Sequence, residues 1–325
     1  MSAIIYYLIL PFLYLISFLP FKVLYLLSDL FYLLIYKVFG YRKKVVTENL
    51  ENSFPEKSTA EIEEIRSDFY HYLCDLSLET IKTLSISPSA LKKHFKSGDM
   101  SAFEHYYKEK QSVIMVMGHL GSWEMGGGYF SQLPLHQLYV IYHPLANKRF
   151  DRLLYRMRTR SGTKLYAMKD TFRGMIKNRK EVTATAFIAD QTPSADNAHW
   201  MTFLNQDTAV FKGTETIARK LDYPVIYLSV IREKRGQYRV HSELLAEHPQ
   251  ELSENELTEM HTKRLEQDII NYPETWLWSH RRWKHKRPEK ALLTEAQLSF
   301  KTEIIAGTEI MLIDILLDCC SMIAL

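Results

Sequence analysis

The sequence predicts an α/β protein with a mixed, largely parallel central sheet flanked by helices. Between residues 112 and 245, apolar segments of strand length alternate with segments of helical periodicity. This alternation is typical of a sheet whose strands are joined through helices, because parallel neighbours need a long crossover. A strongly apolar N-terminus precedes this region and predicts a hydrophobic membrane anchor in front of the α/β domain.

The composition limits the class of protein. The 325 residues suffice for one large domain or two ordinary ones, and 46% hydrophobic with 24% charged residues is typical of a soluble globular chain. The net charge of +3 argues against a general nucleic-acid-binding protein. Cys74, Cys319 and Cys320 lack the spacing of a disulfide framework or a metal site, so we predict a reducing compartment and no metal.

The first 44 residues are predicted to form the anchor. No charged residue precedes Lys22, residues 4–19 are almost entirely apolar, and a second apolar stretch covers residues 23–38. The first stretch can just span a bilayer, and the pair can equally form an interfacial helical hairpin. Because positive charge gathers at residues 37–44, the positive-inside rule predicts that the rest of the chain lies in the cytoplasm. A buried helix of a soluble core is the alternative interpretation.

The elements that follow are predicted from periodicity and from start and stop signals. Ser58 and Glu61 have capping-box spacing, so a long amphipathic helix is expected through Leu84, before a helical patch near residues 88–109. Residues 203–210 are interpreted as a loop. We expect strands over residues 113–117, 138–142, 164–168, 181–189, 225–231 and 238–245, the last near a sheet edge, and helices over residues 147–160, 171–178, 212–221 and 253–270.

The segment Val113–Glu124, VIMVMGHLGSWE, carries the candidate catalytic residues. The apolar run at residues 113–117 predicts a buried strand, Gly118 ends it, and His119 follows at its carboxyl end. Glu124 lies five residues further on, which places the histidine on the turn and the carboxylate in the first turn of the next helix. There the carboxylate can hold one imidazole nitrogen while the other faces a substrate, as an oriented general base requires. A purely structural histidine is the competing interpretation.

Three further segments place polar residues where α/β proteins form sites. Arg158 and Arg160 end a predicted helix ahead of a strand, and Asp190 and Gln191 directly follow a buried strand. A solvated helix face and a tight turn are the structural alternatives. The block at residues 273–288, PETWLWSHRRWKHKRP, combines tryptophans with a basic run, which a membrane interface or lipid phosphates would select.

Several ordered blocks of this sequence resemble one protein family. The blocks are GHLGSWE at 118–124, RMRTRSG at 156–162, ADQTP at 189–193, FKGTE at 211–215 and PETWLWSHRRWK at 273–284. Together with the apolar N-terminus and the YRKKVVTENLENSFPE that follows it, they resemble the bacterial lipid A biosynthesis (lauroyl/myristoyl) acyltransferases, within the lysophospholipid acyltransferase superfamily. The resemblance covers about residues 1–288 and implies a fold like that of the glycerolipid acyltransferases.

The resemblance also implies roles for single residues. His119 falls on the family's catalytic histidine and Glu124 on its acidic partner, while Arg160, or Arg158 beside it, falls on an active-site arginine. Where many members carry Phe-Phe-Gly, this chain has Phe-Leu-Asn at residues 203–205, a departure that affects the shape of that loop. The residues assigned to substrate binding, to the oxyanion or to a phosphate are Gly118, Gly121, Arg158, Arg160 and the Asp-Gln pair, Asp190 and Gln191.

The resemblance implies an enzyme of the cell inner membrane whose acyltransferase domain, residues 45–288, faces the cytoplasm behind the anchor of residues 1–44. It implies transfer of a fatty acyl chain from an acyl-carrier-protein thioester to a hydroxyl of a lipid A precursor, a secondary acylation in lipopolysaccharide biosynthesis. The expected partners are acyl carrier protein and a lipid acceptor in the membrane, with no nucleic acid and no cofactor, and acyl-CoA is the alternative donor. Residues 289–325 form a tail to which we assign no role.

The expected mechanism is direct transfer. His119 takes the proton of the acceptor hydroxyl as it attacks the thioester, Glu124 orients the imidazole, and Arg160 with backbone amides stabilises the oxyanion. The sequence places no serine or cysteine nucleophile beside His119, which argues against an acyl-enzyme. The alternatives are the same chemistry on a lysophospholipid or aminolipid, a metal-dependent hydrolase that uses His119, Glu124 and Asp190, and a non-catalytic membrane-anchored lipid-binding protein.

Overall fold

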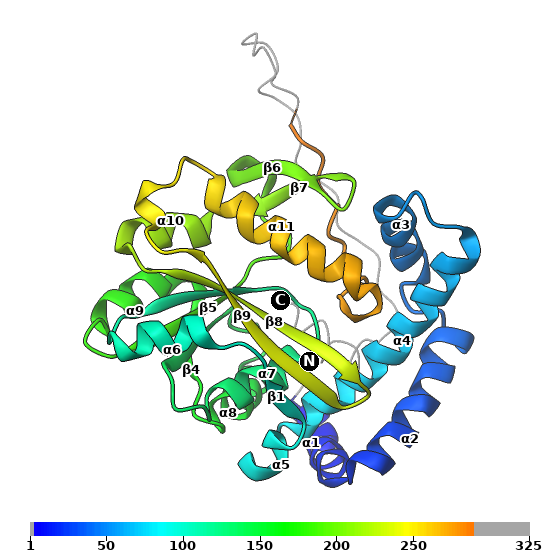
Figure 1. Ribbon diagram of the computed structural model, residues 1–325. Coiled ribbons are helices and arrows are strands. Elements are labelled where there is room, and N and C mark those ends of the chain that lie inside the picture. Colours follow the sequence, from blue (N-terminus) through cyan, green and yellow to red (C-terminus); the bar gives the residue numbers. More distant parts are fainter. Residues whose placement is uncertain (1–2, 289–325) are drawn as a thin grey trace.

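The computed structural model describes residues 3–288, and the predicted tail at residues 289–325 lies outside the described residues (Figure 1). The strands are β1 (Phe95–Ser97), β2 (Val113–Met117), β3 (Gln137–Tyr142), β4 (Lys164–Ala167), β5 (Thr183–Ile188), β6 (Ala198–Phe203), β7 (Gln206–Phe211), β8 (Val225–Lys234) and β9 (Gln237–Ala246). The α-helices are α1 (Ala3–Phe18), α2 (Phe21–Tyr32), α3 (Lys43–Ser53), α4 (Thr59–Lys82), α5 (Pro88–Lys92), α6 (Ser101–Lys108), α7 (Trp123–Phe130), α8 (Lys148–Thr159), α9 (Thr171–Lys177), α10 (Gly213–Leu221) and α11 (Glu256–Asn271).

Seven strands form one mixed sheet in the order β1-β9-β8-β2-β5-β3-β4. Neighbouring strands are parallel except for β8 and β9, which form an antiparallel hairpin. All five residues of β2 are buried, because this strand lies in the interior of the sheet between β8 and β5. The predicted α/β fold with a mixed, largely parallel sheet flanked by helices is confirmed.

Two strand predictions are corrected. The expected loop at residues 203–210 belongs to a hairpin of β6 and β7, whose tight turn places Leu204 and Asn205 at φ +49° and +60°. The turn was not recognised because Leu-Asn replaces the Asn-Gly that signals such hairpins. Strand β9 is not the last strand at its side of the sheet, since β1 pairs with it from within the patch predicted as helical. Three residues are too few for periodicity to reveal β1.

The long helix α4 begins as predicted. The Ser58 hydroxyl accepts the backbone N–H of Glu61, and the Glu61 carboxylate accepts the backbone N–H of Ser58, which forms a complete capping box. Helices α1, α2 and α3 pack along α4 at one side of the molecule, as Figure 1 shows. Helix α3 begins at Lys43, so the boundary predicted between residues 44 and 45 falls inside a helix, and the division into anchor and catalytic domain stays a prediction.

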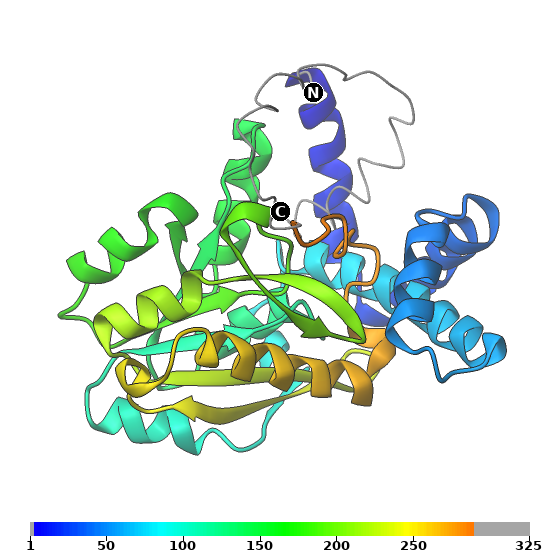
Figure 2. The ribbon, with the colours of Figure 1, turned by 90° about the horizontal axis from the view of Figure 1, so that it is seen from above.

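Helix α1 projects from the rest of the molecule (Figure 2), and one side of it is apolar and exposed. Six of its residues are between 62% and 70% exposed, namely Ile4, Tyr7, Leu8, Phe12, Leu15 and Phe18. Taken singly, no helix within residues 3–288 has both the length and the apolar character of a bilayer span; the sharply bent pair Phe21–Val38 and Lys43–Ser53 meets that test together. Helix α1 has 16 residues, and the choice between a bilayer span and an interfacial hairpin stays a prediction.

Candidate active site

The turn between β2 and α7 has the local structure that the sequence predicts. Strand β2 ends at Met117, His119 lies in the turn, and Glu124 lies in the first turn of α7. Gly121 adopts φ +64°, and a Cβ atom there would lie 1.9 Å from the carbonyl oxygen of Val230. Only glycine fits this position, because L-residues disfavour positive φ and because β8 passes too close for any side chain.

Asp190, and not Glu124, is the carboxylate that holds His119. Asp190 follows β5, the parallel neighbour of β2, so both residues lie at the carboxyl end of the sheet. Nδ1 of His119 lies 2.6 Å from Oδ1 of Asp190, and the backbone N–H of His119 donates to Oδ2 at 2.8 Å. Because a carboxylate only accepts hydrogen bonds, neutral His119 carries its proton on Nδ1 and keeps Nε2 as the acceptor.

The His119–Asp190 pair is buried and well supported. His119 is 5% exposed and Asp190 is 6% exposed. Burial by itself would raise the pKa of Asp190, but the charge of His119 and the hydrogen bonds from His119 and Trp276 outweigh it and hold that pKa well below its usual value. The Trp123 ring packs edge-on against the imidazole with the ring centres 5.0 Å apart, which restricts its rotation.

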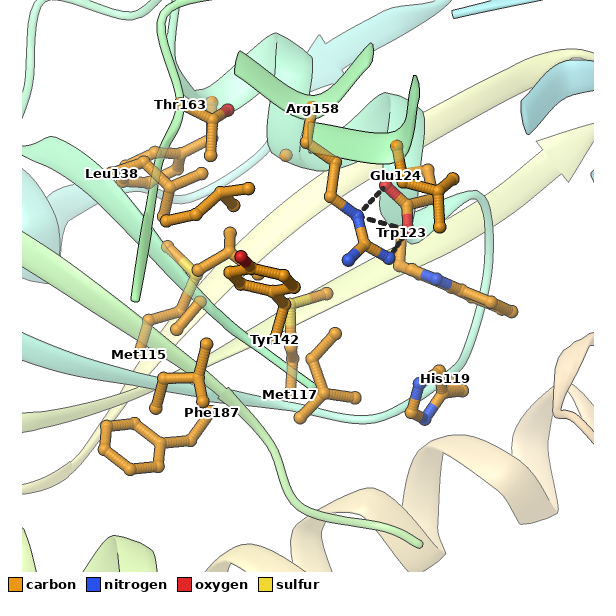
Figure 3. A pocket seen from close by; sticks show the side chains of 18 of the residues that line it. Met115, Met117, His119, Trp123, Glu124, Leu138, Tyr142, Arg158, Thr163 and Phe187 are labelled. Carbon is orange, nitrogen blue, oxygen red and sulfur yellow. Dashed lines mark hydrogen bonds and ion pairs between the residues drawn. The ribbon is translucent and has the colours of Figure 1, made fainter. Parts of the chain in front are cut away.

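Glu124 pairs with Arg158, which corrects the predicted contact between Glu124 and His119. Nε of Arg158 lies 3.1 Å from each carboxylate oxygen, and Nη2 also donates to Oε1. Figure 3 shows Glu124 facing Arg158, with His119 on the other side of Trp123. Helix α8 packs against α7 and brings the arginine to this carboxylate. Burial alone would lower the pKa of Arg158, but the charge of Glu124 raises it, so the guanidinium stays charged.

Arg158, and not Arg160, reaches the site. Arg160 is exposed, and its Nη1 donates to the carbonyl of Leu84 at 2.5 Å. Residues two apart on a helix point in different directions, so only one of the two arginines can face the interior. The resemblance offered both positions, and the packing of α8 selects Arg158.

An apolar cavity of about 270 Å³ begins at His119, Glu124 and Arg158 (Figure 3). His119, Glu124, Arg158 and Gln191 contribute polar groups to its lining. Most of the remaining wall is apolar and includes Met115, Met117, Met125, Leu138, Val140 and Phe187. The cavity therefore suits a long apolar group whose reactive end lies near His119.

The glycines of α7 are explained by close packing and by the cavity. A Cβ on Gly128 would lie 3.0 Å from Leu91, and one on Gly127 would lie 3.8 Å from Leu138. Both glycines line the cavity. Gly128 therefore allows the close approach of Leu91 from α5, whereas Gly127 widens the space for a ligand.

The backbone amides near His119 are already engaged. The N–H of His119 donates to Asp190, and the N–H of Gly121 donates to the carbonyl of Thr275 at 3.2 Å. A Cβ on Gly118 would come within 2.5 Å of Leu265 and 3.2 Å of Oδ2 of Asp190. Gly118 and Gly121 thus allow close packing around the His119–Asp190 pair. The amide of Gly121 is engaged, so its assignment to the oxyanion is corrected, and the assignment of Gly118 stays a prediction.

The first part of the block at residues 273–288 is part of the core, with residues 275–279 all buried. Trp276 and Trp278 are 2% and 0% exposed, so their interpretation as membrane-interface residues is wrong. The indole N–H of Trp276 donates to Oδ2 of Asp190 at 2.8 Å, and its backbone forms an antiparallel bridge with Leu120. Sequence reasoning missed this contact, because a tryptophan followed by arginines and lysines has the same local pattern at a membrane surface.

Fold and site together define an enzyme with an oriented histidine at the end of an apolar cavity. A sequence model of the bacterial lipid A biosynthesis acyltransferases matches residues 1–285. The chain belongs to this family and is an acyltransferase of lipid A biosynthesis.

Individual relatives share about a quarter of their residues with this chain. The lipid A biosynthesis palmitoleoyltransferase of Escherichia coli K12 is 24% identical over 246 residues, which cover 75% of this chain and 79% of that protein. The lipid A biosynthesis acyltransferase of Haemophilus influenzae Rd is 26% identical over 260 residues, covering 78% and 81%. The crystal structure of the 1-acyl-sn-glycerophosphate acyltransferase PlsC from Thermotoga maritima aligns with 14% identity and a TM-score of 0.35, over 79% of this chain and all of that one.

Proposed function

We propose that this chain transfers a fatty acyl group from an acyl-carrier-protein thioester to a hydroxyl of a lipid A precursor, with His119 as the general base. The observation that carries the proposal is the apolar cavity that begins at His119, whose imidazole is held by the buried Asp190. Family membership supports lipid A as the acceptor class. The cavity supports a long acyl chain as the transferred group, because its wall beyond the polar residues is apolar.

In the proposed mechanism, Nε2 of His119 takes the proton of the acceptor hydroxyl, and the oxygen attacks the thioester carbonyl carbon. Asp190 keeps the imidazole in the required tautomer and stabilises the imidazolium that forms. The tetrahedral intermediate then collapses with loss of the thiolate, which takes the proton from His119. The ester and a free thiol are the products, and no acyl-enzyme is formed.

Arg158 is the proposed donor to the oxyanion of the intermediate. It is charged, it lines the cavity, and Glu124 holds its guanidinium from one side. The nearby amides of His119 and Gly121 are engaged elsewhere, which leaves Arg158 as the cationic donor of this wall. Glu124 retains a place in the site as the residue that orients Arg158 and balances its charge.

The proposed place of reaction is the cytoplasmic face of the inner membrane. The exposed apolar side of α1 fits the interfacial region of a bilayer better than water. Leu145, which borders the cavity, packs against the apolar cluster that includes Leu13 of α1, and Phe150 of α8 packs edge-on against Tyr6 of α1. A lipid acceptor in the membrane would then be near the cavity that holds the acyl donor.

The test is acyl transfer in detergent by wild type and His119→Ala side by side. Each receives a tetra-acylated lipid A precursor with either acyl carrier protein or coenzyme A thioester, and products are identified by mass. We expect one added acyl chain with the carrier-protein donor, and a loss of roughly two to four orders of magnitude in rate in the variant. The wild-type rate should survive chelation of metals.

Each contrary outcome points to a different error. Full activity of His119→Ala would remove the general base from the mechanism. Thioester consumption that depends on His119 but yields no acylated lipid A precursor would move the acceptor to another lipid. Trapping of a covalent acyl-protein would replace direct transfer by a two-step route.

A further inference from the structure

Trp276 completes the hydrogen bonding of the catalytic carboxylate from a distant part of the chain. Its Nε1–H donates to Oδ2 of Asp190 at 2.8 Å across 86 residues of sequence. The same oxygen accepts the backbone N–H of His119 at 2.8 Å, while Oδ1 faces Nδ1 of His119. Two donors therefore fix Oδ2, and this leaves Oδ1 in line with the imidazole.

The backbone around Trp276 also holds the turn that carries His119. Trp276 pairs with Leu120 in an antiparallel bridge, and the carbonyl of Thr275 accepts the N–H of Gly121. Leu120 is the residue that follows His119. Trp276 thus holds Asp190 through its indole, and its backbone holds Leu120, the neighbour of the histidine.

The position of Trp276 is fixed from its outer side as well. Its ring packs edge-on against Trp278 at 4.7 Å between ring centres and against Phe203 at 5.9 Å. Beyond it, Asn49 of α3 donates to the carbonyls of Trp278 and His280 at 2.9 and 3.1 Å. The indole therefore cannot rotate away from Asp190 without disturbing this packing.

We propose that Trp276 is a positioning residue for acyl transfer, which orients Asp190 and, through it, His119. The inference rests on the proposed role of His119 as general base. With only the backbone N–H of His119 on Oδ2, the carboxylate can rotate further about its Cβ–Cγ bond, so that Oδ1 moves out of line with Nδ1. The indole N–H prevents that rotation, and substrate never needs to touch Trp276.

Trp276→Phe tests the proposal, with Trp278→Phe as the matched control. Trp278 is equally buried in the same segment, but its Nε1–H donates to the carbonyl of Pro273. We expect Trp276→Phe to lower kcat roughly tenfold to hundredfold with KM for the acyl donor unchanged, as expected for loss of a hydrogen bond to a charged group. Trp278→Phe loses a hydrogen bond to a neutral carbonyl that does not contact Asp190, so kcat should stay within about threefold of wild type. Its loss of thermal stability should be comparable to that of Trp276→Phe.

A double-mutant cycle with Asp190→Asn separates positioning from general packing. If Trp276 acts through Asp190, Trp276→Phe should change kcat by less than about twofold in the Asp190→Asn background. Incorporation of benzothienylalanine at position 276, which replaces only the N–H by sulfur, covers the case in which the phenylalanine variant folds poorly. Its expected kcat equals that of Trp276→Phe.

Two outcomes would overturn the proposal and can be told apart. Equal kcat losses in Trp276→Phe and Trp278→Phe, or losses that add to that of Asp190→Asn, would show that Trp276 only packs, with the role of His119 intact. Unchanged transfer by His119→Ala in the same assay would instead remove the proposed function, and the positioning role with it.

Discussion

Two carboxylates belong to this site, and they are held in different ways: Glu124 lines the apolar cavity, whereas Asp190 supports His119 from outside its lining. Asp190 accepts hydrogen bonds from the ring and backbone of His119 and from Trp276, so separate segments of the chain converge on it. Glu124 receives its three hydrogen bonds from the guanidinium of Arg158. The first arrangement fixes the direction of a base, whereas the second neutralises a buried cation and keeps it charged.

This difference explains why the carboxylate closer in sequence is not the partner of the histidine. Glu124 is only five residues from His119, but α7 directs it to α8 and Arg158. Asp190 is 71 residues from His119, and the pairing of β5 with β2 brings it to within 2.6 Å. Adjacency of parallel strands therefore decides the pair more strongly than spacing along the chain does.

The largest expected effect separates the two carboxylates directly. Asp190→Asn should lower kcat by roughly two to four orders of magnitude, because an amide has one acceptor oxygen where Asp190 uses two. Glu124→Gln keeps an acceptor for Arg158 and should lower kcat by only about tenfold, since a neutral acceptor forms the weaker hydrogen bond. Steady-state transfer assays on both variants measure the two losses of kcat. A larger loss in Glu124→Gln would return Glu124 to the role of partner of His119.

A smaller loss of kcat is expected from substitutions of Arg158 and Arg160, at the C-terminal end of α8. Arg158→Lys loses the planar fork that meets both oxygens of Glu124, so we expect kcat to fall roughly tenfold to hundredfold. Arg160→Lys changes an exposed contact to a backbone carbonyl and should keep kcat within about twofold, because such contacts contribute little. Measuring kcat and KM of both variants checks this contrast, which equal losses would contradict.

The smallest expected effect concerns the space behind Asp190. Asp190, His261 and Arg282 line a cavity of about 10 Å³, and burial lowers the pKa of His261 to about 4. Since an unfolded histidine titrates near 6.5, only the unfolded state binds the extra proton between pH 6.5 and 4. The free energy of unfolding therefore decreases as the pH is lowered through this window. The free energy of unfolding should drop by roughly 2 kcal/mol from pH 7 to pH 5 through this residue.

Denaturant unfolding of wild type and His261→Gln at pH 7 and pH 5 measures this term. The variant should lose less stability than wild type between the two pH values, because glutamine cannot take up the proton. An identical drop in both proteins would mean that His261 titrates alike in the folded and unfolded states, and that other groups cause the pH dependence.

Local features of the sequence were enough to predict most elements. The apolar run of β2, the capping box at Ser58 and the strand that ends before Asp190 all depend on neighbours within a few residues. The turn with His119 was predictable because Gly118 and Gly121 mark where a strand cannot continue. The position of the site could be predicted as well, since polar residues at the carboxyl ends of adjacent parallel strands converge.

Only the tertiary structure decided which side chains meet. The choice of Asp190 over Glu124, of Arg158 over Arg160, and the burial of Trp276 all depend on how α7, α8 and residues 273–288 pack. A sequence pattern records each residue's own neighbours along the chain. Hydrogen bonds across 34, 71 and 86 residues are set by the packing of whole elements, which minimises exposed apolar area and leaves few polar groups unpaired.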